Sequence, residues 1–435
     1  MSVAELEAFR QGSKPSCVVK APPGSGKTQL LVDAAPLWAK AKNSVIVTAL
    51  TNEQVDDICE RLGKANRRMT IVRFTSSTYT IGRELPDNVQ IVRTPSALPK
   101  SYDILISTTA KLAIGGRFRV FDVMFVDEAW QVAFRDLLPL TRFAQRLVMI
   151  GDPGQIPPVQ SVSHLRWDTA PFRPGEAMPE PFLRNAKLRR DTEVIELATC
   201  RRLPLDSVQL VNLFYDFPFA AEAQPHERFL RATPTRARDA LDQALMSFAD
   251  SSSAIVTIPT SQGIGIDTDL ELAEAIANAA VRILKQTDAI RASAKEPKPG
   301  REIQPQDIGI CATHRAMNAA IRSSLPQRLL DSGIVVDTPE RWQGQQRPVM
   351  IIAHPLSGIE HPSGFDLETG RLCVMASRHQ SALLVMSRDH VKQTLDSHMP
   401  SATQSPGLPD AIGGGHAIHT RFWDYHVANR LFAHA

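Results

Sequence analysis

Ala21-Pro22-Pro23-Gly24-Ser25-Gly26-Lys27-Thr28 is the strongest single signal in this chain of 435 residues. Apolar residues 17–19 come before it and apolar residues 30–32 follow it, a pattern that predicts a buried strand, a glycine loop and the start of a helix. Such a loop directs backbone N–H groups at a phosphate chain, and the helix N-terminus adds partial positive charge. An ordinary Gly-Ser-Gly loop is the alternative, and the Lys-Thr pair favours a phosphate site.

Individual residues of this loop have distinct expected roles. Gly24 and Gly26 let the backbone approach the ligand because they carry no side chain. Lys27 is expected to reach the β- and γ-phosphates, and the Thr28 hydroxyl to ligate Mg²⁺. Ala21 stands where the usual pattern begins with glycine. We therefore expect ATP and Mg²⁺ as ligands, with the nucleotide bound at Pro23, Gly24, Ser25, Gly26, Lys27 and Thr28.

Two later apolar runs end in residues suited to phosphate chemistry. The run 123–126 ends in Asp127-Glu128, and such carboxylates are costly there unless a cation or a proton transfer justifies them. We expect Asp127 to hold Mg²⁺ through water, and Glu128 to orient and deprotonate the attacking water. A helix N-cap is the alternative. The run 147–150 leads into a rigid Pro- and Gly-rich loop that is expected to place Gln155 near the γ-phosphate.

Polar residues follow several other predicted strands. The carboxyl ends of parallel strands share the ligand-binding edge of a sheet, so these side chains are candidates to contact the backbone of a bound nucleic acid. For Thr51 and Asn52 a helix N-cap is an equal alternative. The basic run 64–73, which includes Arg73, is most often a solvated face. The nucleic-acid candidates are Thr51, Asn52, Thr108, Thr109, His314 and Thr338.

Composition restricts the class of protein. With 22% charged and 43% hydrophobic residues the chain is an ordinary globular protein, long enough for two core-bearing domains. The net charge is only +3, so nucleic-acid binding would require a local basic groove. The five cysteines form no Cys-x-x-Cys pair, which argues against zinc and disulfides and suits a reducing compartment. We expect a soluble cytoplasmic protein, because no export signal or membrane-spanning run is evident.

The alternation of strand and helix patterns predicts an α/β chain with parallel sheets in two units. We predict an ATP-binding domain over residues 1–190, a second domain over 191–398, and a flexible linker with a C-terminal helix over 399–435. That helix, predicted over 419–432, is a possible contact for a protein partner, and its histidines lack a metal-binding spacing. The protein is expected to be a monomer.

Six elements occur in order between residues 17 and 388. They are the phosphate loop, Asp-Glu-Ala-x-Gln, Gly-Asp-x-x-Gln-x-Pro-Pro, a Tyr-Arg-Met-like element, Val-Asp-Thr followed by Gln-Gly, and Val-x-x-x-Arg. In this the chain resembles superfamily 1 helicases, in the 5′-to-3′ branch that includes the nonsense-mediated-decay helicase. The resemblance implies two tandem RecA-like P-loop domains that hydrolyse ATP and move along single-stranded DNA or RNA.

The resemblance also implies roles for individual residues. Arg201 and Arg378 resemble two arginines that the second domain brings to the γ-phosphate, where such groups stabilise transition-state charge. Gln155 resembles a sensor of the γ-phosphate. Gln11 is a weaker candidate, since helicases often read adenine with a glutamine ahead of the phosphate loop, and a surface polar residue is its alternative.

Several departures from the family pattern bear on the activity. Cys200 stands where a tyrosine usually stacks on adenine, and Gln346 replaces an acidic residue after Gln-Gly. The segment 377–380, Ser-Arg-His-Gln, keeps the first arginine of Thr-Arg-Ala-Arg and loses the second. No large accessory insertion fits between residues 52 and 120, so ATP hydrolysis is expected more firmly than processive unwinding. Two alternatives are an ATP-switched nucleic-acid clamp with little unwinding and a P-loop ATPase that acts on protein partners.

Overall fold

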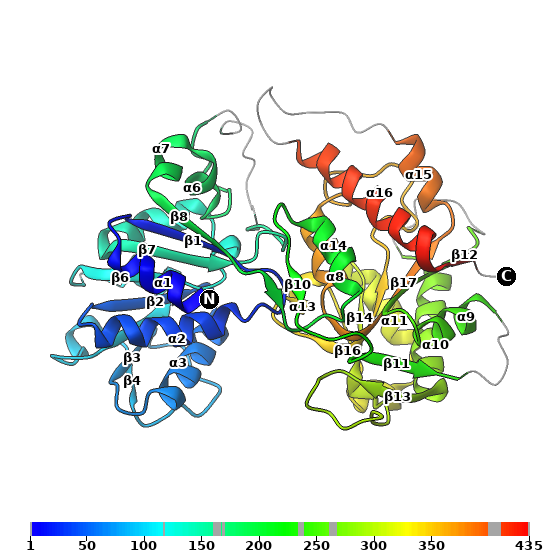
Figure 1. Ribbon diagram of the computed structural model, residues 1–435, viewed down its shortest axis with the longest axis horizontal. Coiled ribbons are helices and arrows are strands. Elements are labelled where there is room, and N and C mark those ends of the chain that lie inside the picture. The colour runs from blue at the N-terminus through cyan, green and yellow to red at the C-terminus, as the bar shows by residue number, and fades with distance from the viewer. Residues whose placement is uncertain are drawn as a thin grey trace. The chain divides into compact units, whose positions relative to one another are not determined.

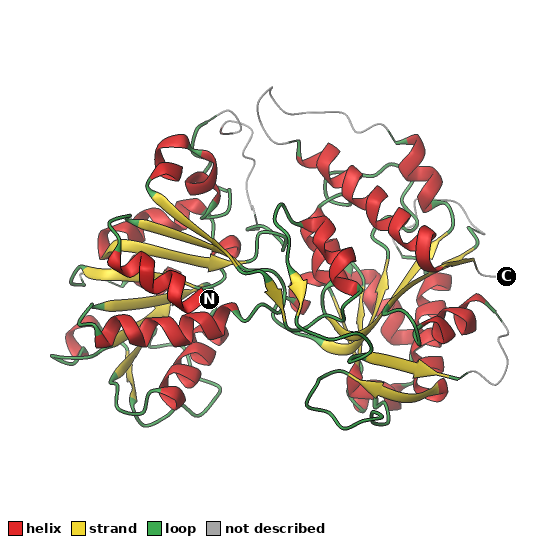
Figure 2. Ribbon diagram, viewed as in Figure 1, coloured by secondary structure: helices red, strands yellow, loops and turns green. Residues whose placement is uncertain are grey.

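The computed structural model describes residues 2–115, 118–159, 167, 170–233, 239–260, 268–398 and 410–433. The chain forms two compact units, shown in Figures 1 and 2. The first comprises Met1–Pro153 and Pro157–Ala198, and the second comprises Gly154–Ile156 and Thr199–Ala435. We predicted that the second domain begins at residue 191, whereas 191–198 group with the first unit because their strand pairs with its sheet.

The first unit is built on an eight-stranded sheet whose described strand pairs are parallel. Its strand order is β4-β3-β5-β2-β6-β7-β1-β8. In this order only β7 lies between β1 and β6. β1 leads into the glycine loop, and β6 leads into Asp127. The strands are β1 (Ser16–Lys20), β2 (Val45–Ala49), β3 (Ile71–Phe74), β4 (Val89–Val92), β5 (Ile104–Thr108), β6 (Phe121–Val126), β7 (Ala144–Gly151) and β8 (Thr192–Glu196).

Helices cover both faces of this sheet, so its central strands are continuous apolar runs. Alternate strand residues enter two separate cores: Val45 and Val47 pack with α1, α2 and α3, whereas Ile46 packs on the opposite face. The α-helices are α1 (Ser2–Gln11), α2 (Lys27–Lys40), α3 (Asn52–Ala65), α4 (Thr109–Ile114), α5 (Phe134–Leu137), α6 (Glu180–Arg184) and α7 (Ala186–Arg190).

The second unit contains a six-stranded sheet of the same kind, with the order β15-β14-β16-β17-β12-β18 and parallel pairing. Its strands are β12 (Ser253–Ile258), β14 (Ile308–Cys311), β15 (Val335–Asp337), β16 (Arg347–Ala353), β17 (His379–Arg388) and β18 (Leu431–Ala433). Two small sheets accompany it: β9 (Thr199–Cys200) with β10 (Ala220–Ala221), and β11 (Phe229–Ala232) with β13 (Thr287–Arg291). Two parallel α/β sheets are the fold that the sequence predicted.

Here too the sheet lies between two cores. One core contains side chains of α9, α10 and α11, and the other contains side chains of α8, α14, α15 and α16. The helices are α8 (Ser207–Val211), α9 (Ala240–Ser247), α10 (Leu270–Gln286), α11 (Arg315–Ser324), α12 (Gln327–Asp331), α13 (Pro339–Trp342), α14 (Thr369–Ala376), α15 (Val391–Ser397) and α16 (Ala411–Arg430).

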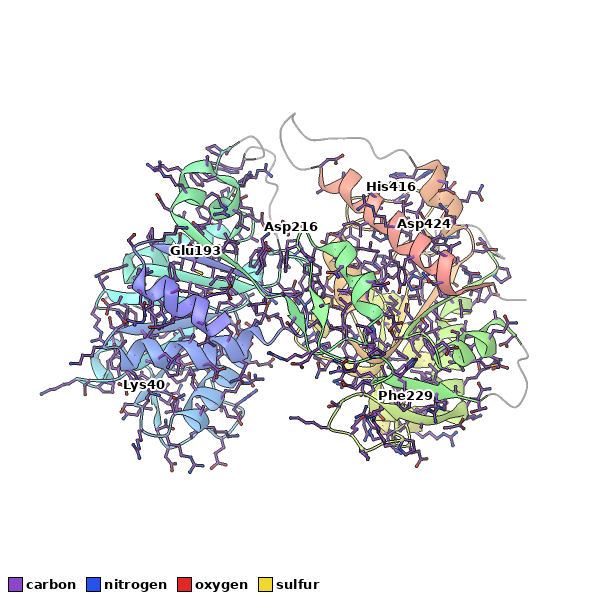
Figure 3. The ribbon with its side chains drawn as sticks, viewed as in Figure 1. Lys40, Glu193, Asp216, Phe229, His416 and Asp424 are labelled. Carbon is purple, nitrogen blue, oxygen red and sulfur yellow. The ribbon has the colours of Figure 1, made fainter. Side chains whose placement is uncertain are left out.

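The C-terminal segment is part of the second unit. Helix α16, marked by His416 and Asp424 in Figure 3, buries Phe422 and Trp423, and β18 then pairs with β12. We predicted a flexible linker followed by a helix over 419–432, but the helix already begins at Ala411 and ends at Arg430. A Cβ at Gly415 would collide with the Leu367 carbonyl oxygen, so the glycine that suggested a linker permits close packing instead. Residues 399–409 lie outside the described residues.

The five cysteines are buried and unbridged. Within the described ranges, no group of three or more His, Cys, Asp or Glu side chains could hold a metal ion. No helix in those ranges combines the length and the apolar character needed to cross a membrane.

Candidate functional site

The glycine loop joins the carboxyl end of β1 to the first residue of α2. Gly24 has a φ of 70° and Gly26 a φ of 86°, and Gly26 is the left-handed N-cap of the helix. Both conformations favour glycine, which explains its spacing in the motif. The Ser25 N–H donates to the Pro22 carbonyl at 3.1 Å, and the Ala21 N–H donates to the Gly151 carbonyl of β7 at 2.8 Å. The loop therefore surrounds a helix N-terminus, the geometry that binds anions.

Two side-chain pairs form beside this loop. The Lys27 ammonium lies 3.0 Å from the Glu128 carboxylate, with side chains only 16% and 12% exposed. The Thr28 hydroxyl donates to Asp127 Oδ2 at 3.1 Å. The fold brings these residues together from about one hundred positions apart, because β1 and β6 end at the same edge of the sheet.

Asp127 and Glu128 differ in their surroundings. Burial raises the pKa of Asp127 to about 7; the neighbouring Glu128 carboxylate adds to this increase and the Lys27 ammonium opposes it. Glu128 has a φ of 52°, the left-handed conformation that a non-glycine residue rarely adopts. Its side chain makes no helix-capping bond, so the N-cap alternative is not what the structure shows. Strain of this kind is common where a side chain must be held at a reacting centre.

The Gln155 segment groups with the second unit. A Cβ at Gly370, in the first turn of α14, would lie 2.7 Å from the carbonyl carbon and oxygen of Gln155. A Cβ at Gly154 would lie 2.5 Å from the Tyr215 ring. The sequence analysis singled out Gln155 but not Gly370 or Tyr215, which belong to no recognisable motif and approach this segment only in three dimensions.

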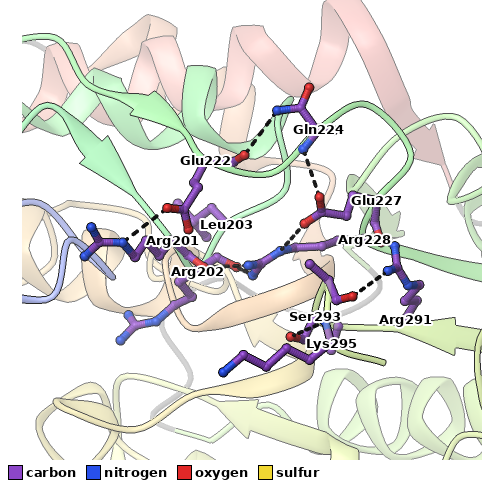
Figure 4. A network of polar contacts seen from close by, with 12 residues as sticks. Arg201, Arg202, Leu203, Glu222, Gln224, Glu227, Arg228, Arg291, Ser293 and Lys295 are labelled. Carbon is purple, nitrogen blue, oxygen red and sulfur yellow. Dashed lines mark hydrogen bonds and ion pairs between the residues drawn. The ribbon is translucent and has the colours of Figure 1, made fainter. Parts of the chain in front are cut away.

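Arg201 and Arg202 begin a polar network in the second unit (Figure 4). Arg201 is exposed and pairs with Glu222 at 3.4 Å. Arg202 donates to the Gln346 side-chain oxygen at 2.8 Å and to the Ser377 carbonyl at 3.1 Å. Gln346, which departs from the acidic residue of the family pattern, is thus a neutral acceptor for an arginine that the sequence analysis left without a role.

Arg378 differs from Arg201 in its environment. Its side chain is almost fully buried, and its Nε and Nη2 atoms have no hydrogen-bond partner among the described residues. Burying these two donors without partners is costly, and an anion could reach them only after the surrounding side chains move. Cys200 is fully buried too, and its sulfur accepts from the Leu203 N–H at 3.4 Å.

The nucleic-acid candidates of the first unit lie at helix starts. Thr51 and Gln54 form a capping box at the start of α3, and Thr108 caps α4 by accepting from the Lys111 N–H at 3.2 Å. Asn52 accepts from Arg73 at 2.8 Å. Arg73 is fully buried and pairs with Asp56 at 2.7 Å, so its assignment to a solvated face was wrong. Its charge is compensated by a carboxylate that the sequence pattern did not identify.

The remaining candidates are scattered. Thr109 is buried in α4, and Thr338 is buried at the start of α13. His314 borders a cavity of about 520 Å³ at the carboxyl ends of β14 and β16. Gln11 ends α1 and donates to Glu7 at 3.1 Å, as a surface polar residue would.

Comparison with known proteins gives two family matches. A model described as an AAA domain matches residues 4–168, and a second model, also described as an AAA domain, matches residues 237–390. The chain is 23% identical over 391 residues to the DNA replication ATP-dependent helicase/nuclease DNA2 of Xenopus laevis, covering 86% of this chain and 36% of that protein. DNA2 of Saccharomyces cerevisiae is 23% identical over 383 residues, covering 84% and 24%.

The chain thus spans about a third or less of the length of these relatives. Among solved structures, Arterivirus nonstructural protein 10 (helicase) aligns with a TM-score of 0.46 and 16% identity, covering 88% of this chain and 61% of that one.

Proposed function

Because the chain belongs to superfamily 1 of the helicases, we propose that it is a nucleic-acid-dependent ATPase that moves along single-stranded DNA or RNA as it hydrolyses ATP. The observation that carries this proposal is the pairing of Lys27 with Glu128 and of Thr28 with Asp127 beside the glycine loop. These four side chains supply a cation for phosphate, a base for water and two hard oxygen ligands for a metal ion.

Lys27 and Glu128 suggest how hydrolysis is restricted to the bound nucleotide. In their ion pair, the Lys27 ammonium lies 3.0 Å from Glu128 Oε1, so each group stabilises the charge of the other. Phosphate oxygens at the glycine loop would draw the Lys27 ammonium away, which would free the Glu128 carboxylate to orient and deprotonate water. The base would therefore become available only when nucleotide is present.

Thr28 and Asp127 fit Mg²⁺. Both offer oxygen ligands, and burial together with the neighbouring Glu128 carboxylate raises the pKa of Asp127 more than the Lys27 ammonium lowers it, so a further cation would favour its ionised form. When bound, Mg²⁺ would neutralise charge on the β- and γ-phosphates.

In this proposal the second unit contributes Arg201 and Arg378. Arginines of this kind stabilise charge on the transferred phosphoryl group. The Nε and Nη2 atoms of Arg378 have no hydrogen-bond partner among the described residues, and a movement of the surrounding chain would be needed to bring them to a phosphate. The nucleic-acid backbone would contact Thr51, Asn52 and His314, which reach the surface. Thr108, Thr109 and Thr338 are at most 8% exposed and would contact it only if the adjoining helix starts moved. Movement from 5′ to 3′ rests on the motif resemblance, and the narrower likeness to the nonsense-mediated-decay helicase stays a prediction.

The test is ATP turnover measured with single-stranded DNA, with single-stranded RNA and without polymer. We expect severalfold stimulation by one of the polymers and loss of turnover in K27A, whose phosphate-binding ammonium is missing. Equal, low turnover under the three conditions would contradict a nucleic-acid-dependent motor.

A second candidate is an ATP-switched clamp that binds nucleic acid with little or no unwinding. The burial of Cys200, where a stacking tyrosine is usual, and the neutral Gln346 beside Arg202 favour it. A clamp would show ATP-dependent affinity for the oligonucleotide without stimulated turnover, so the same assay separates the two.

A further inference from the structure

A chain of buried hydrogen bonds connects His379 to Asp206 in the second unit. His379 Nε2 lies 2.6 Å from the Ser207 hydroxyl, which lies 2.5 Å from the Ser252 hydroxyl. Ser252 in turn donates to Asp206 Oδ1 at 2.7 Å, and its backbone N–H donates to Asp206 Oδ2 at 2.7 Å. His379, Ser207 and Ser252 are each at least 95% buried, so water does not replace these bonds.

The Ser252 hydroxyl is placed to donate to Asp206, because a carboxylate oxygen accepts. The donor and acceptor roles of Ser207 and of the His379 ring nitrogens depend on which imidazole tautomer is present. Burial lowers the pKa of His379 to about 3, a decrease that a hydrogen bond with the Ala376 backbone opposes, so the ring is neutral near pH 7. In either tautomer, Nε2 and Ser207 share one hydrogen bond.

These bonds join the two arginine-bearing segments. Ser207 begins α8, shortly after Arg201, and His379 directly follows Arg378. Arg202 makes a second connection by donating to the Ser377 carbonyl at 3.1 Å. The two connections hold residues on both sides of Arg378 against the segment that carries Arg201. His379 stands at the alanine position of Thr-Arg-Ala-Arg, and alanine could not make such a bond.

We infer that His379 is a positioning residue, which acts through Ser207, Ser252 and Asp206 to hold Arg378 and Arg201 in one fixed arrangement for ATP hydrolysis. The inference rests on the proposed function. His379 is fully buried, so it would act through its neighbours and not by contact with a phosphate. Its loss would let Arg378 sample other positions, and a misplacement of about 1 Å at a reacting centre can reduce a rate by up to about 10²-fold.

The experiment compares steady-state ATP turnover, at saturating single-stranded oligonucleotide, in wild type, H379A, H379Q and S207A. The matched control is H426A, because His426 is also fully buried and bonds the hydroxyl of a buried serine, Ser253, at 2.6 Å. We expect H379A and S207A to lower kcat about tenfold with KM for ATP within about twofold of wild type, because misplaced arginines weaken transition-state binding. In H379Q the amide nitrogen can reach Ser207, so turnover should be restored.

H426A should lose thermal stability and keep its kcat. Normal kcat in H379A, or a loss in H379A no greater than in H426A, would overturn the inference. If H379A does not fold, S207A and H379Q provide the test. A normal kcat in S207A would overturn the inference. A tenfold lower kcat in S207A, together with a wild-type kcat in H379Q, would support it. Wild-type protein without turnover would instead refute the proposed function.

Discussion

Glu128 combines an unfavourable backbone conformation with a buried ion pair to Lys27. If it is the base, E128Q should lower kcat at least about 10²-fold, because a neutral amide cannot accept the proton of the attacking water. The affinity for ATP should be unchanged or higher in this variant. Without the Glu128 carboxylate, Lys27 does not have to break an ion pair before it binds the phosphates. ATP turnover and the binding of a fluorescent ATP analogue measure the two effects separately.

Glu193 provides the control for this residue. It lies in β8 of the same sheet and pairs with Lys14 at 2.7 Å, with 43% of its side chain exposed, and Lys14 precedes the amino end of β1, whereas the glycine loop follows the carboxyl end. E193Q should therefore turn over ATP normally. Full activity in E128Q would remove the assigned base.

Residues of contiguous motifs were predictable in a way that their distant partners were not. The loop, the acidic pair and their shared sheet edge follow from short patterns whose chemistry has few alternatives. The pairing of Arg73 with Asp56, and the bond of His379 to Ser207, join residues that are far apart in the chain. A lone arginine or histidine in a sequence does not indicate whether burial has provided it with a partner.

At the scale of elements, strands with continuous apolar runs were identifiable, whereas the interior strand β3, which contains the buried Arg73, and the edge strands β8 and β18 were not. β2 and β6 are continuous apolar runs, as packing between two helical layers requires. β8 is Thr-Glu-Val-Ile-Glu, and β18 covers three residues, so neither has a distinctive pattern. The glycines of α16 indicated a linker because their close packing depends on a contact that is not visible in sequence.

Helix α16 carries two fully buried histidines with different surroundings. His426 bonds Ser253 at 2.6 Å and the Phe422 carbonyl at 2.8 Å, whereas neither ring nitrogen of His419 has a hydrogen-bond partner among the described residues. Burial lowers the pKa of each histidine to about 4. In the unfolded chain each histidine has its ordinary pKa of about 6.5. Between pH 4 and 6.5 the unfolded chain therefore binds more protons than the folded protein does.

The free energy of unfolding should therefore fall as the pH falls from 6.5 towards 4. At pH 5 each histidine should cost about 2 kcal/mol relative to pH 7.5. H419L removes one of these groups without breaking a described bond, so it should equal or exceed wild-type stability at pH 7.5 and lose less on acidification. Chemical denaturation at pH 7.5 and pH 5 measures both effects.

H426L is the matched control for H419L. It should show the same reduced sensitivity to acid, but it should lose about 1–3 kcal/mol at pH 7.5, because Ser253 is left buried without its partner. His354, His416 and Asp366 also influence His419, and H419L leaves them in place. An acid response in H419L as steep as in wild type would show that His419 does not titrate in this window.

At the scale of the whole molecule, the residues proposed for ATP hydrolysis belong to two different units. The first holds the glycine loop with Lys27 and Glu128, and the second holds Arg201 and Arg378. The sequence predicted both folds, but motifs cannot specify how strongly one unit influences the other. The net charge of +3 does not resolve this either, since it describes no local surface.

Coupling between ATP and nucleic acid can be measured at equilibrium in E128Q, which should bind ATP without consuming it. Because linkage is reciprocal, the factor by which ATP changes the oligonucleotide Kd must equal the factor by which oligonucleotide changes the ATP Kd. We expect a factor of about 5 to 150, the range usual for coupled sites. Fluorescence anisotropy of a labelled oligonucleotide, and binding of a labelled ATP analogue, measure the two factors independently. K27A should show a factor of one in the first measurement. A factor of one in E128Q itself would exclude both the motor and the switched clamp, because each requires ATP binding to alter the grip on the strand.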